Sequence, residues 1–107
     1  MAKMPPFTLT YDPAATLHLD AIDRKYHSLI RRGIEEQLGF EPETRTRNRK
    51  PLGQPMTLGA RWELRLGPDN CFRVFYRVDA ERHQVRILGI GVNERNRIFL
   101  GGEEVKI

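Results

Sequence analysis

The sequence lacks the residues and motifs on which several common chemistries depend. Cys71 is the only cysteine among 107 residues, so a disulfide within the chain is excluded. The three histidines are scattered, and neither an HExxH nor a CxxC motif occurs, so we expect no metal and no cofactor. A Walker-A loop, a dinucleotide fingerprint and a nucleophile elbow are also absent. Enzymes that rely on these devices are therefore disfavoured.

Long apolar runs are absent as well. The first residues, MAKMPPFTLTYDP, contain no apolar run of signal-peptide length, and no segment of the sequence is suited to spanning a membrane. We therefore expect a cytoplasmic protein without a membrane partner, and a single cysteine suits that reducing compartment. The length predicts a single domain over residues 1–107.

Charged residues, in contrast, are plentiful and mainly basic. Lysine and arginine together number 18 against 14 aspartates and glutamates, which leaves a formal charge of +4. A basic excess of this kind favours an acidic partner, which means nucleic acid, an acidic protein or both.

Two segments in the middle of the chain, residues 62–66 and 72–78, alternate between apolar and polar residues. This period of two is typical of half-buried strands, and the GPDN sequence between them is suited to a turn. If the strands form an antiparallel hairpin with one apolar face, even-numbered residues must pair with even-numbered ones. One such register forms the pairs Trp62–Tyr76, Leu64–Val74 and Leu66–Phe72.

The other face of this hairpin carries charges of one sign. The same register places Arg65 opposite Arg73 and Arg61 opposite Arg77, with Glu63 between them. Like charges directly opposite each other destabilise a sheet. Either these arginines form a solvated face on which Glu63 is a partial counter-charge, or the face receives an anion.

The N-terminal part predicts a strand followed by two helices. Residues 7–11 alternate as a short strand, and Asp12 before Pro13 is a favourable start for a helix over residues 13–19. A second helix is expected after Asp20, with Gly39 as the residue that ends it. Its apolar stripe consists of Ile22, Tyr26, Leu29, Ile30 and Leu38. Because a sheet with an apolar face needs a covering layer, we predict an α+β fold in which an N-terminal helix hairpin covers one face of a small antiparallel sheet.

Residues 41–59 predict a long loop because prolines and glycines interrupt any regular helix. In an extended segment Arg45, Arg47 and Arg49 point the same way, with Lys50 beside them. This cluster fits either phosphate binding or a solvated charged loop.

The C-terminal part predicts an interior strand over residues 85–92, a polar turn and a terminal hairpin at Gly101–Gly102. Gly89 and Gly91 leave one face of the interior strand without side chains, as happens where a backbone or ligand approaches closely.

The reaction that such a basic sheet could assist is phosphodiester cleavage. Cleavage of RNA by its own 2′-hydroxyl needs a base, cations around the phosphorane and a proton for the leaving oxygen. Arginine can supply only the cations, because its pKa is too high for it to act as a base. Glu63 is the candidate base if it lies beside Arg65 and Arg73, and its alternative role is that of a cross-strand ion-pair partner.

The order of these segments resembles the RelE/ParE superfamily of bacterial toxins, and most of all its RelE branch. The similarity runs from residue 7 to about residue 99 and includes the segments RNRKPL, WELRL, CFRVFYRVD and VRILGIGVNER. It implies a microbial RNase-like fold and a type II toxin that is a ribosome-dependent endoribonuclease, or mRNA interferase, and blocks translation. The implied partners are the ribosome, mRNA and a cognate acidic antitoxin, with operator DNA bound only through the toxin–antitoxin complex.

The resemblance also assigns roles to residues. Arg73 and Arg65 match the basic positions of the family's third and second strands, whereas Glu63, Asn93 and Phe99 stand where the family has a basic residue, an arginine and a tyrosine. The candidate catalytic residues are Arg73, Arg65 and Glu63. The candidate RNA-binding residues are Arg45, Arg47, Arg49, Lys50, Arg77, Arg95 and Phe99. The departures leave two alternatives open: a ParE-like toxin that inhibits gyrase without catalysis, and a degenerate toxin fold that only binds its antitoxin.

Overall fold

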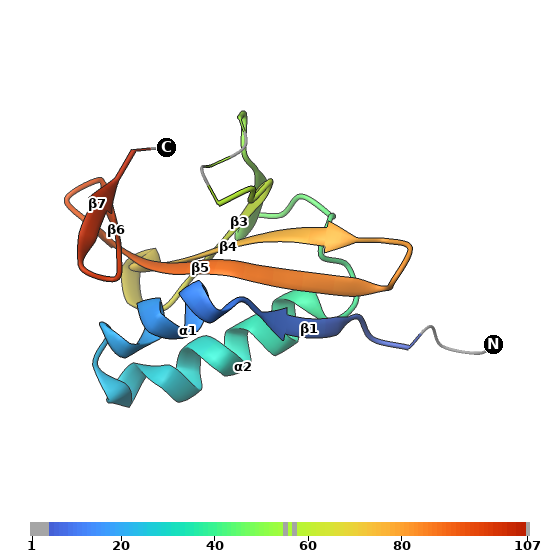
Figure 1. Ribbon diagram of the computed structural model, residues 1–107, viewed down its shortest axis with the longest axis horizontal. Coiled ribbons are helices and arrows are strands. Elements are labelled where there is room, and N and C mark those ends of the chain that lie inside the picture. The colour runs from blue at the N-terminus through green and yellow to red at the C-terminus, as the bar shows by residue number, and fades with distance from the viewer. Residues whose placement is uncertain (1–4, 55, 57, 107) are drawn as a thin grey trace.

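The computed structural model describes residues 5–54, 56 and 58–106. In this part of the chain a seven-stranded sheet packs against two α-helices (Figure 1). The elements are β1 (Thr8–Tyr11), α1 (Pro13–Asp20), α2 (His27–Leu38), β2 (Arg49–Pro51), β3 (Trp62–Leu66), β4 (Phe72–Asp79), β5 (Gln84–Glu94), β6 (Arg97–Leu100) and β7 (Glu103–Val105). Both helices lie on the same side of the sheet, so the predicted α+β architecture is confirmed.

Strand β5 is the centre of the sheet. The order is β2-β3-β4-β5-β6-β7 with antiparallel neighbours, and β1 pairs with β5 in parallel. Along β5, residues 84–92 pair with β4 on one edge. On the other edge, residues 84–87 of β5 pair with β1 and residues 91–94 pair with β6. Strands β1 and β6 therefore share the other edge of β5, end to end, and the predicted interior strand is confirmed.

The predicted register of β3 and β4 is confirmed at each of its three apolar pairs, Trp62–Tyr76, Leu64–Val74 and Leu66–Phe72. This register gives the sheet two chemically different faces. The face toward α1 and α2 is here called the helix face, and the opposite face, which carries Arg65, Arg73 and Arg77, is called the arginine face.

The main core lies between the helix face and the two helices. Asp12 caps α1, because its Oδ1 accepts a hydrogen bond from the backbone N–H of Ala14 at 2.9 Å, as the sequence predicted. Fully buried side chains from both layers meet there: Ala15, Ile30, Ile34, Leu38, Leu64, Val74, Tyr76, Val85 and Ile87.

The start of the second helix differs from the prediction. Asp23 rather than Asp20 supplies the cap, and its Oδ1 accepts a hydrogen bond from the N–H of Lys25 at 3.0 Å. This cap begins a single 3-10 turn, Arg24–Tyr26, and α2 follows from His27. Both aspartates suit a cap, and the tertiary position of the chain selects the second one.

The buried stripe and the end of α2 also differ. Leu29 is 40% exposed, and the buried row instead runs through Ile30, Ile34 and Leu38 at a spacing of four residues. Gly39 follows the helix directly, but its φ of −69° is right-handed, so it does not end the helix through the left-handed conformation that was expected.

The predicted loop at 41–59 contains one strand. Residues 49–51 form β2 and pair with β3, with Arg49 opposite Leu64 and Lys50 opposite Glu63. Pro51 is tolerated because β2 is an edge strand, where a missing N–H breaks no ladder. The prediction of a wholly irregular segment is therefore wrong at this point, and Pro55, which supported it, lies outside the described residues.

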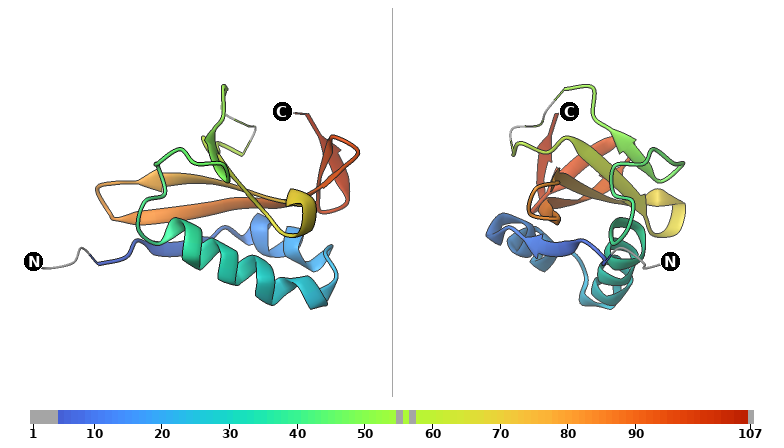
Figure 2. Two further views of the ribbon diagram at one scale, coloured as in Figure 1. Left: turned by 180° about the vertical axis from the view of Figure 1, so that it is seen from behind. Right: turned by 90° about the vertical axis from the view of Figure 1, so that its right-hand side faces the viewer.

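A second core, which the alternation did not predict, covers part of the arginine face. Ala60, Phe75, Leu88 and Leu100 are buried there, and Leu52, Met56, Leu58, Ile98 and Val105 pack against them. Figure 2 shows the β6–β7 hairpin rising on the side of the sheet opposite the helices. A Cβ added to Gly89 or Gly91 would lie 2.9 Å from Leu58 Cδ1 or 2.7 Å from Leu100 Cδ2 respectively. The predicted close approach is confirmed, and apolar side chains make it.

Neither helix in the described ranges is long and apolar enough to cross a membrane.

The helix layer is joined to the edge of β5 through His18. Its Nδ1 accepts a hydrogen bond from the backbone N–H of Ile90 at 3.3 Å, in the stretch of β5 between the parts that pair with β1 and β6. Burial lowers the pKa of His18, and the charge of Asp12 opposes this effect. The folded protein therefore favours a neutral ring.

This histidine predicts an acid-sensitive contribution to stability. With a lowered pKa in the folded state, the stabilisation is present above the unfolded value of about 6.5 and is lost as the pH falls below it. From about pH 7.5 to about pH 5.5, we expect the free energy of unfolding to fall more steeply for the wild type than for His18→Gln. Glutamine can accept the same hydrogen bond without titrating. Urea unfolding at several pH values measures both proteins, and parallel curves would contradict the assignment.

Candidate active site

Three neighbouring strands bring four of the predicted site residues together on the arginine face. Lys50 of β2 lies opposite Glu63 of β3, and Arg65 of β3 lies opposite Arg73 of β4. Their neighbours along each strand face the helices, as Phe72 does in the main core. Because side chains alternate along a strand, the four charged groups share the other face.

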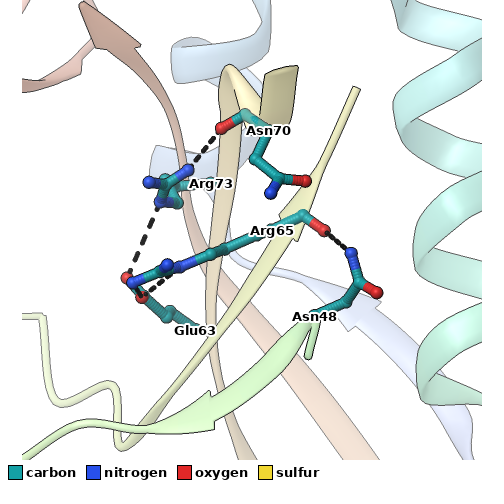
Figure 3. Close-up of polar contacts among 5 residues, drawn as sticks. All are labelled: Asn48, Glu63, Arg65, Asn70 and Arg73. Atoms are coloured by element: carbon teal, nitrogen blue, oxygen red, sulfur yellow. Dashed lines mark hydrogen bonds and ion pairs between the residues drawn. The ribbon is translucent and has the colours of Figure 1, made fainter. Parts of the chain in front are cut away.

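The carboxylate of Glu63 lies between the two arginines (Figure 3). Its Oε1 accepts a hydrogen bond from Arg65 Nε at 2.9 Å and lies 2.8 Å from Arg65 Nη2. Its Oε2 lies 4.0 Å from Arg73 Nε. One carboxylate thus offsets the repulsion between two opposed guanidinium groups, and the group of three keeps a net positive charge.

Arg73 is the more firmly held of the two arginines. Its side chain is 10% exposed against 32% for Arg65, and its Nη1 donates to the backbone carbonyl of Asn70. Burial lowers the pKa of Arg73, and the positive charge of Arg65 adds to this effect while Glu63 opposes it. An arginine stays charged at neutral pH, so the site presents one fixed and one more accessible cation.

Two asparagines hold this arrangement, and the sequence analysis did not identify either. Asn48 Nδ2 donates to the backbone carbonyl of Arg65 at 3.0 Å, and the N–H of Arg65 donates to the carbonyl of Asn48 at 2.8 Å. Asn70 has a φ of 53°, a left-handed conformation that asparagine tolerates better than most residues. The GPDN sequence could have indicated this role, because asparagine in a turn favours the left-handed conformation and Asn70 lies three residues before Arg73.

The basic loop does not act as a unit. Arg49 is 9% exposed and turns toward α2, where its Nε donates to Thr44 O at 3.0 Å and its Nη1 donates to Gln37 O. Arg45 and Arg47 are exposed, so the expectation that all three point the same way is wrong. The physical reason is the β2 register, which places Arg49 on the helix face within reach of carbonyl groups at the end of α2.

The remaining RNA-binding candidates are dispersed. Phe99 lies opposite Val92, and Val92 lies opposite Phe72, so its ring belongs to the helix face and lines a hollow of about 280 Å³ with His18. The structure therefore does not bring Phe99 to Arg73. Arg95 is exposed in the β5–β6 turn, and Arg77 is exposed on the arginine face.

The geometry supports binding and stabilisation of a phosphate group. Two guanidinium groups beside each other can donate several hydrogen bonds to the oxygens of a phosphorane. Glu63 Oε2 is the carboxylate oxygen that does not bond Arg65. Within the described ranges, no three histidine, cysteine or carboxylate side chains are grouped closely enough to hold a metal ion.

The chain has the RelE-like toxin fold, in which a helix pair covers one face of a small sheet. Here the opposite face carries the arginines. A solved structure shows the likeness directly: a chain of the toxin–antitoxin complex RelBE2 from Mycobacterium tuberculosis superposes with a TM-score of 0.64 and 26% sequence identity. The alignment covers 79% of this chain and 95% of that one. No family model and no curated protein matches the sequence. The predicted RelE-like resemblance is confirmed by the structural neighbour.

The turn before Arg73 depends on a glycine. Gly67 has a φ of 84° and a ψ of 176°, and a Cβ there would collide with the Phe72 ring. We expect Gly67→Ala to lower the free energy of unfolding by at least about 1–3 kcal/mol, the usual cost of such backbone strain.

Gly53→Ala is the matched control for this substitution. Gly53 has no positive φ, and a Cβ there would meet no atom of the described residues within 4 Å. We expect it to raise the free energy of unfolding by about 0.4–1 kcal/mol, because alanine restricts the unfolded chain. Urea unfolding of both variants checks the difference, and equal effects would refute it.

Proposed function

We propose that the chain is the toxin of a type II toxin–antitoxin pair and that it cleaves mRNA in a ribosome-dependent way. The observation that carries this proposal is the cluster of Glu63, Arg65 and Arg73 on the arginine face, together with the likeness to a chain of a toxin–antitoxin complex. The reaction needs no cofactor, because the 2′-hydroxyl of the RNA is the nucleophile.

The proposed mechanism divides the chemistry among these side chains. Arg73 and Arg65 bind the non-bridging oxygens of the scissile phosphate and stabilise the charge of the phosphorane. Glu63 takes the proton of the 2′-hydroxyl at Oε2, since Oε1 is bonded to Arg65. Lys50 lies opposite Glu63 on β2, and we assign to it the protonation of the leaving 5′-oxygen.

The proposed partners follow from charge. The exposed Arg45 and Arg47 extend the positive surface beyond the cluster and can hold ribosomal or messenger RNA. An acidic, partly disordered antitoxin would neutralise the same face. Disordered segments can wrap large surfaces when they fold on binding. The complex of both proteins would then bind operator DNA, and the site of action would be the cytoplasm.

One observation favours a second candidate, a ParE-like toxin that inhibits gyrase without catalysis. Phe99, at the family's tyrosine position, lies on the helix face and cannot stack on a base held at Arg73. A toxin that acts by protein contact alone would not need an aromatic side chain there.

Substitution of Arg73 distinguishes the two functions. We expect Arg73→Ala to lower the cleavage rate of ribosome-bound mRNA by about 10²–10³-fold, because the variant lacks one stabiliser of the transition-state charge. Arg82→Ala, which removes a 75% exposed arginine in the turn between β4 and β5, is the control and should leave the rate unchanged. The measurements are growth arrest on induced expression and primer extension on a reporter mRNA. Growth arrest with intact mRNA would exclude the RNase function, and an Arg73→Ala protein that cleaves mRNA at the wild-type rate would exclude the proposed role of Arg73.

Substitution of Glu63 tests its role as base. We expect Glu63→Gln to lower the single-turnover cleavage rate by about 10²–10⁴-fold, because the amide cannot accept the proton of the 2′-hydroxyl. Glutamine can still accept the hydrogen bond from Arg65, so the geometry is largely retained. A cleavage rate equal to that of the wild type would leave Glu63 as an ion-pair partner only.

A further inference from the structure

A second pair of opposed arginines lies at the other end of the arginine face. Arg77 of β4 and Arg86 of β5 are direct cross-strand partners. Their chain neighbours Tyr76 and Val85 are fully buried in the main core, so both arginines project to the face that carries Arg73. The arginine face thus has one like-charged pair at each end of β4.

This second pair is poorly neutralised. Among the described residues, Arg77 forms no ion pair. Arg86 Nη2 lies 4.0 Å from Asp12 Oδ2, but the other oxygen of that carboxylate already caps α1. Arg86 Nε is buried and has no hydrogen-bond partner in the described part of the chain. Like charges directly opposite each other cost stability, and no carboxylate of residues 5–54, 56 or 58–106 pairs with both arginines as Glu63 does in the first pair.

Arg61 adds a third cation at this end. The sequence predicted Arg61 opposite Arg77, but the β3–β4 ladder ends at the pair Trp62–Tyr76 and does not include Arg61. The N–H of Arg61 instead donates to Tyr76 O at 3.1 Å. Arg61 and Arg77 nevertheless line one hollow of about 300 Å³. Its rim includes Asp79 and Glu81, and Asp79 Oδ2 lies 3.8 Å from Arg82 Nε.

We propose that Arg61, Arg77 and Arg86 form a second phosphate subsite for the same single-stranded RNA whose scissile phosphate lies at Arg73. This inference rests on the proposed function and extends it to the substrate. Arg73 and Arg77 are four residues apart on one strand, which is about 13 Å. Phe75, between them, is buried in the second core, so the two cationic sites are separate and a strand that joins them passes over this core. Contacts of this kind bind single strands by charge rather than by base sequence. The substrate is therefore a single-stranded segment that reaches both ends of β4.

The experiment compares two double variants that remove the same charge. Arg77→Gln with Arg86→Gln removes the subsite, and Arg24→Gln with Arg31→Gln removes two exposed arginines from the helix layer. The probes are labelled 2′-O-methyl oligouridylates of increasing length, which cannot be cleaved through their own 2′-hydroxyl. Fluorescence anisotropy measures affinity at several salt concentrations, and urea unfolding shows whether each variant is folded.

For the wild type we expect affinity to rise with length until the strand reaches both subsites. In the Arg77/Arg86 variant the rise should stop at a shorter length. The slope of log K against log salt should also fall by about 0.7 for each phosphate that the variant no longer neutralises. The helix-layer variant should behave as the wild type.

Three results would overturn the inference. If the Arg77/Arg86 variant matches the control while Arg73→Gln weakens binding, the second subsite is wrong and the proposed function stands. If neither substitution affects RNA binding, both fail. If the Arg77/Arg86 variant binds RNA normally but no longer binds the acidic antitoxin, this end of the sheet is a protein-binding surface.

Discussion

The pairing of β3 with β4 in a single register is the constraint on which the rest of the structure depends. It places Leu64 and Val74 against the helices and Arg65 and Arg73 on the opposite face. A slip of one residue would exchange the two sets, because side chains alternate along a strand. The arginines would then enter an apolar core without partners, which costs several kcal/mol per charge, about the net stability of a small domain. The same apolar contacts that stabilise the fold therefore assemble the cationic site.

The shared carboxylate makes this assembly tolerable without removing its affinity for anions. Glu63 bonds one arginine through Oε1 and faces the other through Oε2. Two positive charges and one negative charge leave an excess that an approaching phosphate can neutralise. Arg73 lies two residues before the fully buried Phe75 on the same face and is itself only 9% exposed, so its charge interactions are stronger than in open water. The group thus keeps one excess positive charge in surroundings where it acts strongly.

The sequence-based predictions were correct where neighbouring residues alone determine the structure, and they failed where distant segments of the chain determine it. The β3–β4 register and the Asp12 cap were predicted correctly, because both follow from adjacent residues and backbone geometry. The start of α2 was not, since Asp20 and Asp23 are equally suitable caps on local grounds. The face of the sheet on which Arg49 and Phe99 lie could not be predicted, because it depends on strands that pair with distant parts of the chain.

The sequence by itself determined the alternation of β3 and β4, and with it the cluster of Glu63, Arg65 and Arg73. This was possible because the two-residue period is a property of the extended backbone alone. Only the tertiary structure decided that Lys50 joins the cluster while Arg49 turns to α2, and that Leu58 and Leu100 fill the space above two glycines. These outcomes depend on which segments meet in space, and the free energy of such long-range contacts is not encoded in any one stretch of residues.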